Sequence, residues 1–256
     1  FESTVKCCTQ NGVRGGSATV HFPIWHKEIE DIIVLKNNKG TEDNRVRKLD
    51  YSIQLSKLFY ERFINDEEIT LFSPHEVPEL YEAWGSESFD ELYLTAERKT
   101  SVSKKKVSAQ SLFFDMLKER AETGRIYIMN IDHCNSHSSF KDRIYMSNLC
   151  QEITLPTDPI QHIDGEGEIA LCILSAINVG KLSYLEDLES LCDLAVRALD
   201  EIIDHQKYPV KAAEVSTKAR RSLGIGYIGL AHYLAKLKLN YNDKQAWKEV
   251  DELTEN

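Results

Sequence analysis

The sequence lacks several features that would place the protein in a specialised class. No apolar run approaches the roughly 18–20 residues that a membrane-spanning helix needs, and no secretory leader pattern opens the chain. Its six cysteines form no Cys-x-x-Cys pair, so neither a zinc ribbon nor a thioredoxin-type motif is indicated. We therefore expect a cytoplasmic protein with reduced thiols and no membrane partner.

Positive charge is also scarce. The chain has 31 Lys and Arg against 41 Asp and Glu, which gives a formal net charge of −10. Broad nucleic-acid binding needs a basic surface, so no nucleic-acid partner is expected. The apolar fraction of 42% is that of an ordinary globular protein, and a locally basic nucleotide pocket remains compatible with the overall charge.

Strand-like and helix-like segments alternate along the chain, without a repeat or a low-complexity linker, and this favours an α/β fold. Alternating or continuous apolar residues predict strands at 17–25, 49–53, 68–72, 125–131, 147–155 and 168–174. Apolar residues spaced by three and four predict helices at 104–122, 185–205 and 226–236. Gly124 and Pro209 should end the first two of these helices.

The most informative polar pattern lies at residues 147–152, with the sequence Ser-Asn-Leu-Cys-Gln-Glu. On a strand, Asn148, Cys150 and Glu152 would share one face and offer an amide, a thiol and a carboxylate. Burying unpaired polar groups costs about 1–3 kcal/mol each. Such a strand is therefore either one wall of an active site or a solvated edge strand with a passive cysteine.

Two further groups of side chains deserve a chemical interpretation. Cys172 lies in the next expected strand and could open onto the same cavity as Cys150, or it could simply be a small core residue. His133, Cys134 and His137 could donate metal ligands, but no fourth ligand follows at a familiar spacing. We therefore expect no bound metal.

A glycine-rich loop occupies residues 8–17. It contains Gln10, Arg14, Gly15 and Gly16, so its backbone can approach a ligand closely while the guanidinium meets a phosphate or a base edge. The loop is neither a phosphate-binding P-loop nor a dinucleotide fingerprint. An ordinary glycine-rich turn is equally compatible with this pattern.

Taken in chain order, these segments resemble class I ribonucleotide reductase large subunits. The matching runs are Gly-Val-Arg-Gly-Gly at 12–16, Ser-Asn-Leu-Cys-Gln-Glu at 147–152 and Gly-Glu-Gly-Glu-Ile-Ala-Leu-Cys at 165–172. Shorter matches lie at 23–26, 35–40, 44–47, 123–127 and 223–226. The resemblance extends from Phe1 to about Lys236 and identifies the chain as a member of that family.

The resemblance implies a ten-stranded α/β barrel with a central finger loop that carries the radical cysteine at its tip. Residues 1–256 would be a partial catalytic barrel domain. The effector cone at the N-terminus, the first barrel strands and the C-terminal part of the subunit would lie outside the chain. A finger loop departs from the strand placement of Cys150 suggested by alternation, so the motif would straddle a strand end and a loop.

The resemblance also implies a role for each motif residue. Cys150 would carry a transient thiyl radical and abstract the 3′-hydrogen of the substrate. Glu152 would take the proton of the 3′-hydroxyl, and Asn148 would orient the ribose. Cys172 would be one of the two cysteines of a redox-active disulfide, with its partner cysteine before Phe1 in the family and absent here.

The glycine-rich loop matches the family's specificity loop, which connects the effector site to the substrate base. Gln10 and Arg14 are then the expected contact residues. Arg45 and Arg47 follow in a second loop, where they either buttress the first loop or form ordinary surface ion pairs.

The family's chemistry implies several partners for this chain. The substrate would be a ribonucleoside diphosphate, and the radical would come from a metal-containing small subunit. Nucleoside triphosphate effectors, a reductant such as thioredoxin or glutaredoxin, and a homodimer of the full-length large subunit complete the set. No cofactor is expected in the chain itself.

The resulting hypothesis is an oxidoreductase that supplies deoxyribonucleotides as DNA precursors. The isolated chain should be inactive, because the second reducing cysteine and the radical relay are missing. The alternative is a non-catalytic nucleotide-binding piece of a split or decayed subunit. A glycyl-radical enzyme with a related barrel would require a glycyl-radical motif, which the sequence does not contain.

Overall fold

The computed structural model describes residues 1–162, 165–182 and 187–255, and the chain forms two compact units, Phe1–Pro156 and Thr157–Asn256. Each unit contains both helices and strands, which confirms the α/β class. The described residues form sheets of two or three strands, so the ten-stranded barrel remains a prediction. Among these residues, no helix is both long and apolar enough to cross a membrane.

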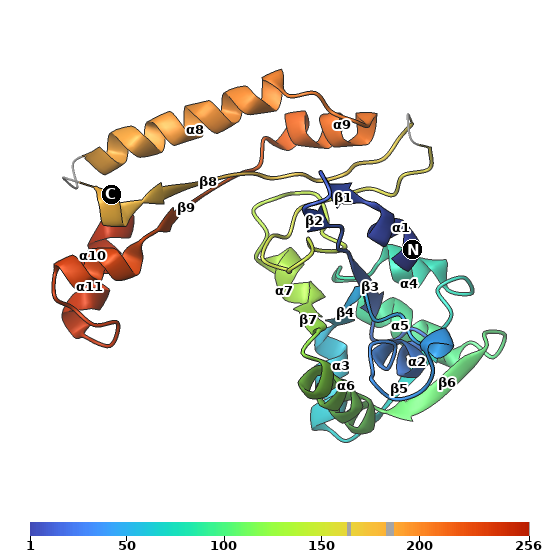
Figure 1. Ribbon diagram of the computed structural model, residues 1–256. Helices are drawn as coiled ribbons and strands as arrows, with labels where there is room; N and C mark the ends of the chain where they lie inside the picture. Colours follow the sequence, from blue (N-terminus) through green and yellow to red (C-terminus); the bar gives the residue numbers. More distant parts are fainter. Residues whose placement is uncertain (163–164, 183–186, 256) are drawn as a thin grey trace. The chain divides into compact units, whose positions relative to one another are not determined.

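The first unit is organised around a parallel three-stranded sheet (Figure 1). Its strands, in spatial order, are β3 (Thr19–Pro23), β4 (Asp50–Leu55) and β7 (Ile126–Asn130). The register aligns His21 with Ser52 and Ser52 with Tyr127. Aligned side chains in a sheet share a face, so these three residues form a row across the sheet.

The central strand β4 is buried on both faces but differs between them. Tyr51, Ile53 and Leu55 point to one side and belong to the hydrophobic core. Ser52 and Gln54 point to the other side and are also buried. Buried polar side chains are almost always hydrogen-bonded, so this second face must meet polar partners.

Helices and small sheets surround the parallel sheet. The helical elements are α1 (Glu2–Cys7), α2 (Ile29–Ile33), η1 (Glu42–Asn44), α3 (Lys57–Ile64), α4 (Pro78–Glu82), α5 (Phe89–Arg98), α6 (Ala109–Thr123) and α7 (Ile131–Ser136). The two antiparallel pairs are β1 (Thr9–Gln10) with β2 (Arg14–Gly15) and β5 (Glu68–Phe72) with β6 (Lys104–Ser108). Buried aromatic residues, among them Trp25, Trp84 and Phe89, pack together in the core of this unit.

One predicted helix of this unit begins later than expected. Residues 104–108 form β6 and pair with β5, and α6 begins only at Ala109. Ser108 caps the helix by accepting a hydrogen bond from the Ser111 amide at 3.2 Å. Lysine is a good helix former, so local propensity favoured a helix at residues 104–108. Pairing with β5 makes this segment a strand instead. The predicted end is confirmed, since Gly124 follows α6 with φ of 66°.

In the second unit, the described residues form one parallel pair of strands and four α-helices (Figure 1). Its elements are β8 (Ile173–Asn178), η2 (Val179–Lys181), α8 (Asp187–His205), α9 (Lys211–Arg220), β9 (Leu223–Ile228), α10 (Leu230–Lys236) and α11 (Lys244–Glu255). Helix α8 packs along both strands, and Val179, Leu188 and Leu253 form a small core.

Two predictions for this unit are wrong in position. The strand expected at 168–174 begins only at Ile173, so Cys172 directly precedes it. The helix expected at 226–236 starts only at Leu230, because residues 223–228 form strand β9. Gly224 faces the Leu174 side chain, where a Cβ would come within 2.6 Å, so glycine permits close strand pairing. Helix α8 is confirmed over 187–205, and residues 185–186 lie outside the described residues.

Candidate functional site

The motif at residues 147–152 forms a tight turn rather than a strand, which corrects the interpretation from alternation. The Gln151 amide donates to the Asn148 carbonyl at 3.2 Å, and the Asn148 amide donates to the Ile153 carbonyl at 3.3 Å. Gln151 has φ of 65°, in the left-handed region. The expectation of a loop that carries Cys150, which came from the family resemblance, agrees with this geometry.

Asn148 closes the turn with its side chain. Its Oδ1 accepts hydrogen bonds from the Ile153 amide at 3.0 Å and from the Ser147 hydroxyl at 3.2 Å. The Ser147 hydroxyl also lies 2.7 Å from the Ile153 carbonyl oxygen. These contacts occupy the Asn148 carbonyl oxygen, and its Nδ2 group makes no hydrogen bond with any other described residue. That amide nitrogen is therefore the part that could orient a ligand.

The segment leading into the turn is held by two buried or half-buried amides. Asn135 at the end of α7 bonds both backbone groups of Ile144, at 3.0 and 2.9 Å. Gln54 of β4 donates to the Tyr145 carbonyl at 2.5 Å and accepts from the Trp84 indole at 2.7 Å. The polar face of β4 therefore positions the approach to the turn.

The turn itself contacts all three strands of the parallel sheet. Thr19 of β3 donates to the Leu149 carbonyl at 2.6 Å. Gln151 donates to the Ser52 hydroxyl of β4. The Tyr127 side chain of β7 lies beside the thiol of Cys150. Hydrogen bonds from β3 and β4 therefore fix the turn over the N-terminal half of the sheet strands.

The two reactive groups of the turn are accessible. Both Cys150 and Glu152 are exposed, whereas Asn148 is half-buried. Burial raises the pKa of the Tyr127 phenol, and the neighbouring Cys150 and Asp50 raise it further. Tyr127 therefore stays protonated at neutral pH and keeps an O–H group for the sulfur. An accessible thiol beside a phenol and a carboxylate can support nucleophilic or radical chemistry.

His21 lies beneath the turn, on the same sheet face as Ser52. Both ring nitrogens are shielded from solvent, and the ring lies against the backbone of Ser147. Burial lowers the pKa of His21, and the Ser147 backbone opposes part of that effect. The imidazole is therefore neutral at pH 7, and its protonation would place a charge under the turn.

We expect His21 to make the first unit less stable in acid. Its folded-state pKa lies below the unfolded value of about 6.5, so the unfolded chain binds more protons as pH falls. The contribution of His21 to stability is fully present above its unfolded-state pKa. It is lost as the pH falls through its folded-state pKa. Urea unfolding at several pH values between about 5 and 8 measures how the free energy of unfolding changes with pH. This change should be smaller for His21→Phe than for the unmodified chain.

Two other histidines define the controls for this measurement. His26 also has a pKa lowered by burial, so some pH dependence should remain in His21→Phe. His75 is exposed, and His75→Phe should show the same pH dependence of the unfolding free energy as the unmodified chain. If His21→Phe and the unmodified chain showed the same pH dependence of stability, this dependence could not be assigned to His21.

Cys172 lies in the second unit, immediately before β8, and is half-buried. The preceding residues are held by an ion pair between Arg220 and Glu168, with 2.6 Å between Nη1 and Oε2 and both side chains largely buried. The Ile173 amide donates to the Ser222 carbonyl at 3.2 Å. Cys150 and Cys172 belong to different units, so their convergence on one cavity remains a prediction.

The glycine-rich loop forms the β1–β2 hairpin, in which Gln10 pairs with Arg14. Arg14 and Gly15 are exposed, so the guanidinium is accessible to a ligand. The side chain of Gln10 lies outside the described residues. Gly16 is closely packed, because a Cβ there would come within 2.3 Å of the Val5 carbonyl oxygen.

The two adjacent glycines should differ sharply on substitution. Gly16→Ala should destabilise the first unit by about 1–3 kcal/mol, because the methyl group meets two backbone oxygens at 2.3 and 2.6 Å. Gly15→Ala has open space around its Cβ and should change stability by less than about 0.5 kcal/mol. Urea unfolding of the two variants measures the difference, and equal stabilities would contradict the packing at Gly16.

The second arginine-containing loop has local partners. Arg47 pairs with Glu42 and donates to the Asn37 carbonyl at 3.0 Å, which confirms the ion-pair interpretation for this residue. Arg45 donates to the neighbouring Asn44 carbonyl at 2.7 Å. Support of the glycine-rich loop by either residue remains a prediction.

The residues considered as metal ligands lie on α7 and just after it. His133 and His137 have ring centroids 5.6 Å apart, and Cys134 packs against the hydrophobic core. Burial raises the pKa of the Cys134 thiol, which favours the protonated form over the thiolate that metals bind. Within the described part of the chain, no group of three or more metal-binding side chains forms.

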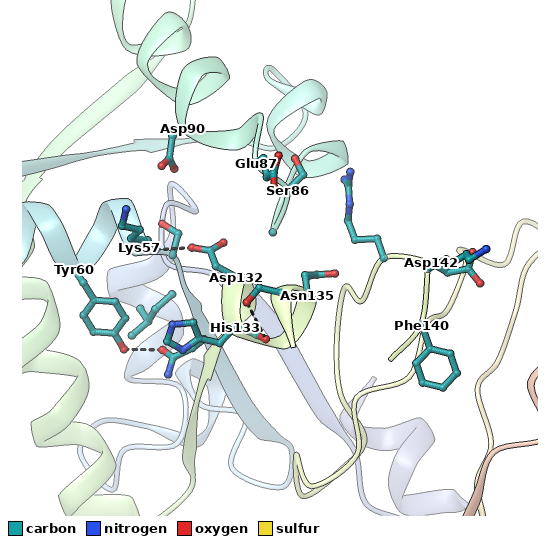
Figure 2. A pocket seen from close by; sticks show the side chains of 17 residues that line it. Lys57, Tyr60, Ser86, Glu87, Asp90, Asp132, His133, Asn135, Phe140 and Asp142 are labelled. Atoms are coloured by element: carbon teal, nitrogen blue, oxygen red, sulfur yellow. Dashed lines mark hydrogen bonds between the residues drawn. The ribbon is translucent and has the colours of Figure 1, made fainter. Parts of the chain in front are cut away.

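A cavity of about 770 Å³ lies at the carboxyl ends of β4 and β7 (Figure 2). Asp132 accepts from the Lys57 amide at 2.6 Å, and Tyr60 donates to Asn130 at 2.8 Å. Burial and the nearby Asp132 raise the pKa of Asp90. None of the residues predicted from sequence as site residues lines this cavity, which lies toward the strand ends away from the Cys150 turn.

Sequence reasoning did not identify the side chains that hold the turn. Thr19 and Ser52 bond the turn, Gln54 bonds the segment before it, and Tyr127 lies beside Cys150. A signal was present in β4, where polar and apolar residues alternate in a strand that is central to its sheet. Alternation is usual for a half-exposed strand, so the pattern alone did not show that both faces are buried.

Comparison with known proteins adds independent information. A family model described as the barrel domain of ribonucleotide reductase matches residues 1–256. The chain is 55% identical over 252 residues to the ribonucleoside-diphosphate reductase subunit alpha of Buchnera aphidicola subsp. Schizaphis graminum. It is 56% identical to the ribonucleoside-diphosphate reductase subunit alpha of Haemophilus influenzae and 52% identical to the ribonucleoside-diphosphate reductase 1 subunit alpha of Escherichia coli K12, again over 252 residues. Each match covers 96% of this chain and 33% of the relative, so the chain spans about a third of their length.

Proposed function

Because this chain belongs to the ribonucleotide reductase barrel-domain family, we propose that it is part of a catalytic subunit that reduces ribonucleoside diphosphates to deoxyribonucleotides. In this proposal, the two units contribute strands to a ten-stranded barrel, and residues 144–153 are its central finger loop. The small two- and three-stranded sheets of the chain are compatible with a larger closed sheet.

The observation that carries the proposal is the exposed thiol of Cys150 on a turn that is hydrogen-bonded to two strands, β3 and β4. Hydrogen abstraction requires the sulfur to lie close to one carbon, in a geometry that a mobile loop would not maintain. The accessible carboxylate of Glu152 and the amide nitrogen of Asn148 belong to the same turn. A radical centre, a base and an orienting group are thus supplied by five consecutive residues.

The proposed reaction assigns one step to each side chain. The Cys150 sulfur radical takes the 3′-hydrogen atom, forming an S–H bond and leaving a carbon radical. Glu152 takes the 3′-hydroxyl proton, and the 2′-hydroxyl leaves as water with a proton from a reducing cysteine. Two reducing cysteines, one of them Cys172, supply two electrons and two protons by closing to a disulfide. One proton leaves in the water, the other ends in the new C–H bond at the 2′-carbon, and Glu152 returns its proton to the 3′-oxygen. Cys150 then returns its hydrogen atom to the 3′-carbon, and the sulfur radical is restored.

The remaining partners follow from the same proposal. The initial radical comes from a separate metal-containing subunit, and thioredoxin or glutaredoxin reopens the disulfide. Nucleoside triphosphate effectors act through the β1–β2 hairpin, where Arg14 is accessible and Gln10 is its strand partner. The full-length subunit forms a homodimer.

A segment exchange tests the proposal. The matching third of the Escherichia coli subunit is replaced by this chain, which gives a hybrid protein called here the exchange subunit. With the radical-generating subunit, a reductant and an effector, the exchange subunit should reduce cytidine diphosphate. The isolated 256-residue chain should not. A folded exchange subunit that binds nucleotides but shows no turnover would contradict catalysis and favour the non-catalytic nucleotide-binding alternative.

A further inference from the structure

Gln151, the residue that follows Cys150, adopts an unusual backbone conformation. Its φ of 65° lies in the left-handed region, which the structure assigns to only five non-glycine residues among those it describes. Glycine adopts this conformation without steric cost, and asparagine tolerates it better than most residues. The cost of this backbone conformation at a glutamine must be offset by other interactions of the fold.

The side chain of Gln151 has a specific partner in the centre of the sheet. Its Nε2 donates to the hydroxyl of Ser52, which is completely buried on the middle strand β4. Within the described residues, the Ser52 hydroxyl has no other hydrogen-bond partner. A buried hydroxyl left without a partner is unfavourable, so each residue satisfies a requirement of the other.

The position of this contact matters because of what lies beside it. Leu149, before Cys150, is tied to Thr19 of β3, and Gln151, after Cys150, is tied to Ser52 of β4. The residues on both sides of Cys150 are therefore held by different strands, Leu149 through its backbone carbonyl and Gln151 through its side chain. Removal of one tie would leave Cys150 on a turn that can swing about the other.

We propose that Ser52 and Gln151 are a positioning pair that holds the sulfur of Cys150 in the geometry needed for hydrogen abstraction. The inference rests on the proposed function of Cys150 and adds two residues that do not touch the reacting atoms. Displacement of a reacting group by about 1 Å can lower a rate by about 100-fold, so a single hydrogen bond near the sulfur can affect turnover strongly.

The pair is distinct from the other contact of β4 with this segment. Gln54 binds the Tyr145 carbonyl and also accepts from Trp84, so its loss would disturb the core as well as the approach to the turn. Ser52 and Gln151 bond each other and can be removed separately or together. They are therefore suited to a double-mutant cycle, which isolates a pairwise interaction.

The test uses Ser52→Ala, Gln151→Asn and the double variant in the exchange subunit. Asparagine tolerates the left-handed backbone but is one methylene too short to keep the contact. Each single variant should speed hydrogen exchange of the Gln151 and Ile153 amides about three- to tenfold, the factor expected from one hydrogen bond. In the double variant, the hydrogen-exchange rates of these amides should be no higher than in the more affected single variant.

Turnover provides a second measurement that a purely structural role would not affect in this way. Each single variant should lower kcat about tenfold while KM changes less than about twofold, because nucleotide binding does not depend on the position of the sulfur. Ser52→Thr keeps the hydroxyl and should restore most of kcat. The control is Lys238→Asn, at another left-handed residue whose side chain is exposed, and it should alter neither measurement.

The possible failures are distinguishable. The positioning pair would be overturned if the increases in hydrogen-exchange rate of the two single variants multiplied in the double variant. Unchanged kcat in Gln151→Asn would also overturn it. Either result would leave the proposed function intact. Absence of turnover in the unmodified exchange subunit would overturn the proposed function itself. The hydrogen-exchange cycle would still decide whether Ser52 and Gln151 act together on the turn.

Discussion

Cys150→Ser in the exchange subunit should abolish nucleotide reduction while nucleotide binding remains. The O–H bond of serine is stronger than the S–H bond of cysteine, so the serine side chain cannot be converted to a radical under the same conditions. The substitution removes only polarizability and a small volume from an exposed position, so the turn should keep its shape. Product formation should fall below detection, with substrate affinity within about twofold of the unmodified protein.

Cys7→Ser provides a matched control for this prediction, because Cys7 is likewise exposed in the same unit. That variant should retain full turnover. Hydrogen exchange of the Gln151 amide in Cys150→Ser should match the unmodified protein, which shows that the turn has not unfolded. Persistent reduction by Cys150→Ser would refute the radical role of this sulfur.

Glu152→Gln should lower kcat by about 100- to 10,000-fold, the range typical of a lost general base. The carboxylate of Glu152 is exposed and makes no hydrogen bond or ion pair with any other described residue. Its removal should therefore cost little stability, and the loss should appear in kcat rather than in KM. Steady-state kinetics with the exchange subunit, together with urea unfolding of the same variant, separate the two effects.

Glu91→Gln is the control for charge removal, since Glu91 is an exposed residue of α5, away from the turn in sequence. It should leave both kcat and stability unchanged. If Glu152→Gln kept normal kcat, the base would have to be another group, and Glu152 would be only a solvent-facing residue of the turn. Glu152→Asp should give an intermediate rate, because it keeps the carboxylate but shortens its reach.

Local patterns predicted most strands and helices of the chain where packing reinforced them. β5 agrees with its predicted range at both ends, and α8 agrees throughout its described part. The failures occurred where a distant segment decided the conformation. β6 became a strand because β5 offers it a partner, and β9 became a strand because β8 does. Neither partner is visible in a local window of sequence.

The motif at 147–152 illustrates the same limit more closely. Alternation of polar and apolar residues predicted a strand, yet this segment pairs with no other strand. Its backbone groups are instead satisfied within the turn and by Thr19. The order Asn-Leu-Cys-Gln-Glu still predicts the reactive residues by resemblance, because that prediction depends on residue identity rather than on a strand.

The amino-acid sequence by itself determined the chemical groups of this protein: the thiol, carboxylate and amide of the motif, the second cysteine, and a formal net charge of −10. Only the tertiary structure decided how the thiol at position 150 is held, because that depends on Thr19 and Ser52 from two separate strands. Their hydrogen bonds to the turn join residues 130 and 99 positions apart and form only when the sheet has assembled, so no local pattern encodes them.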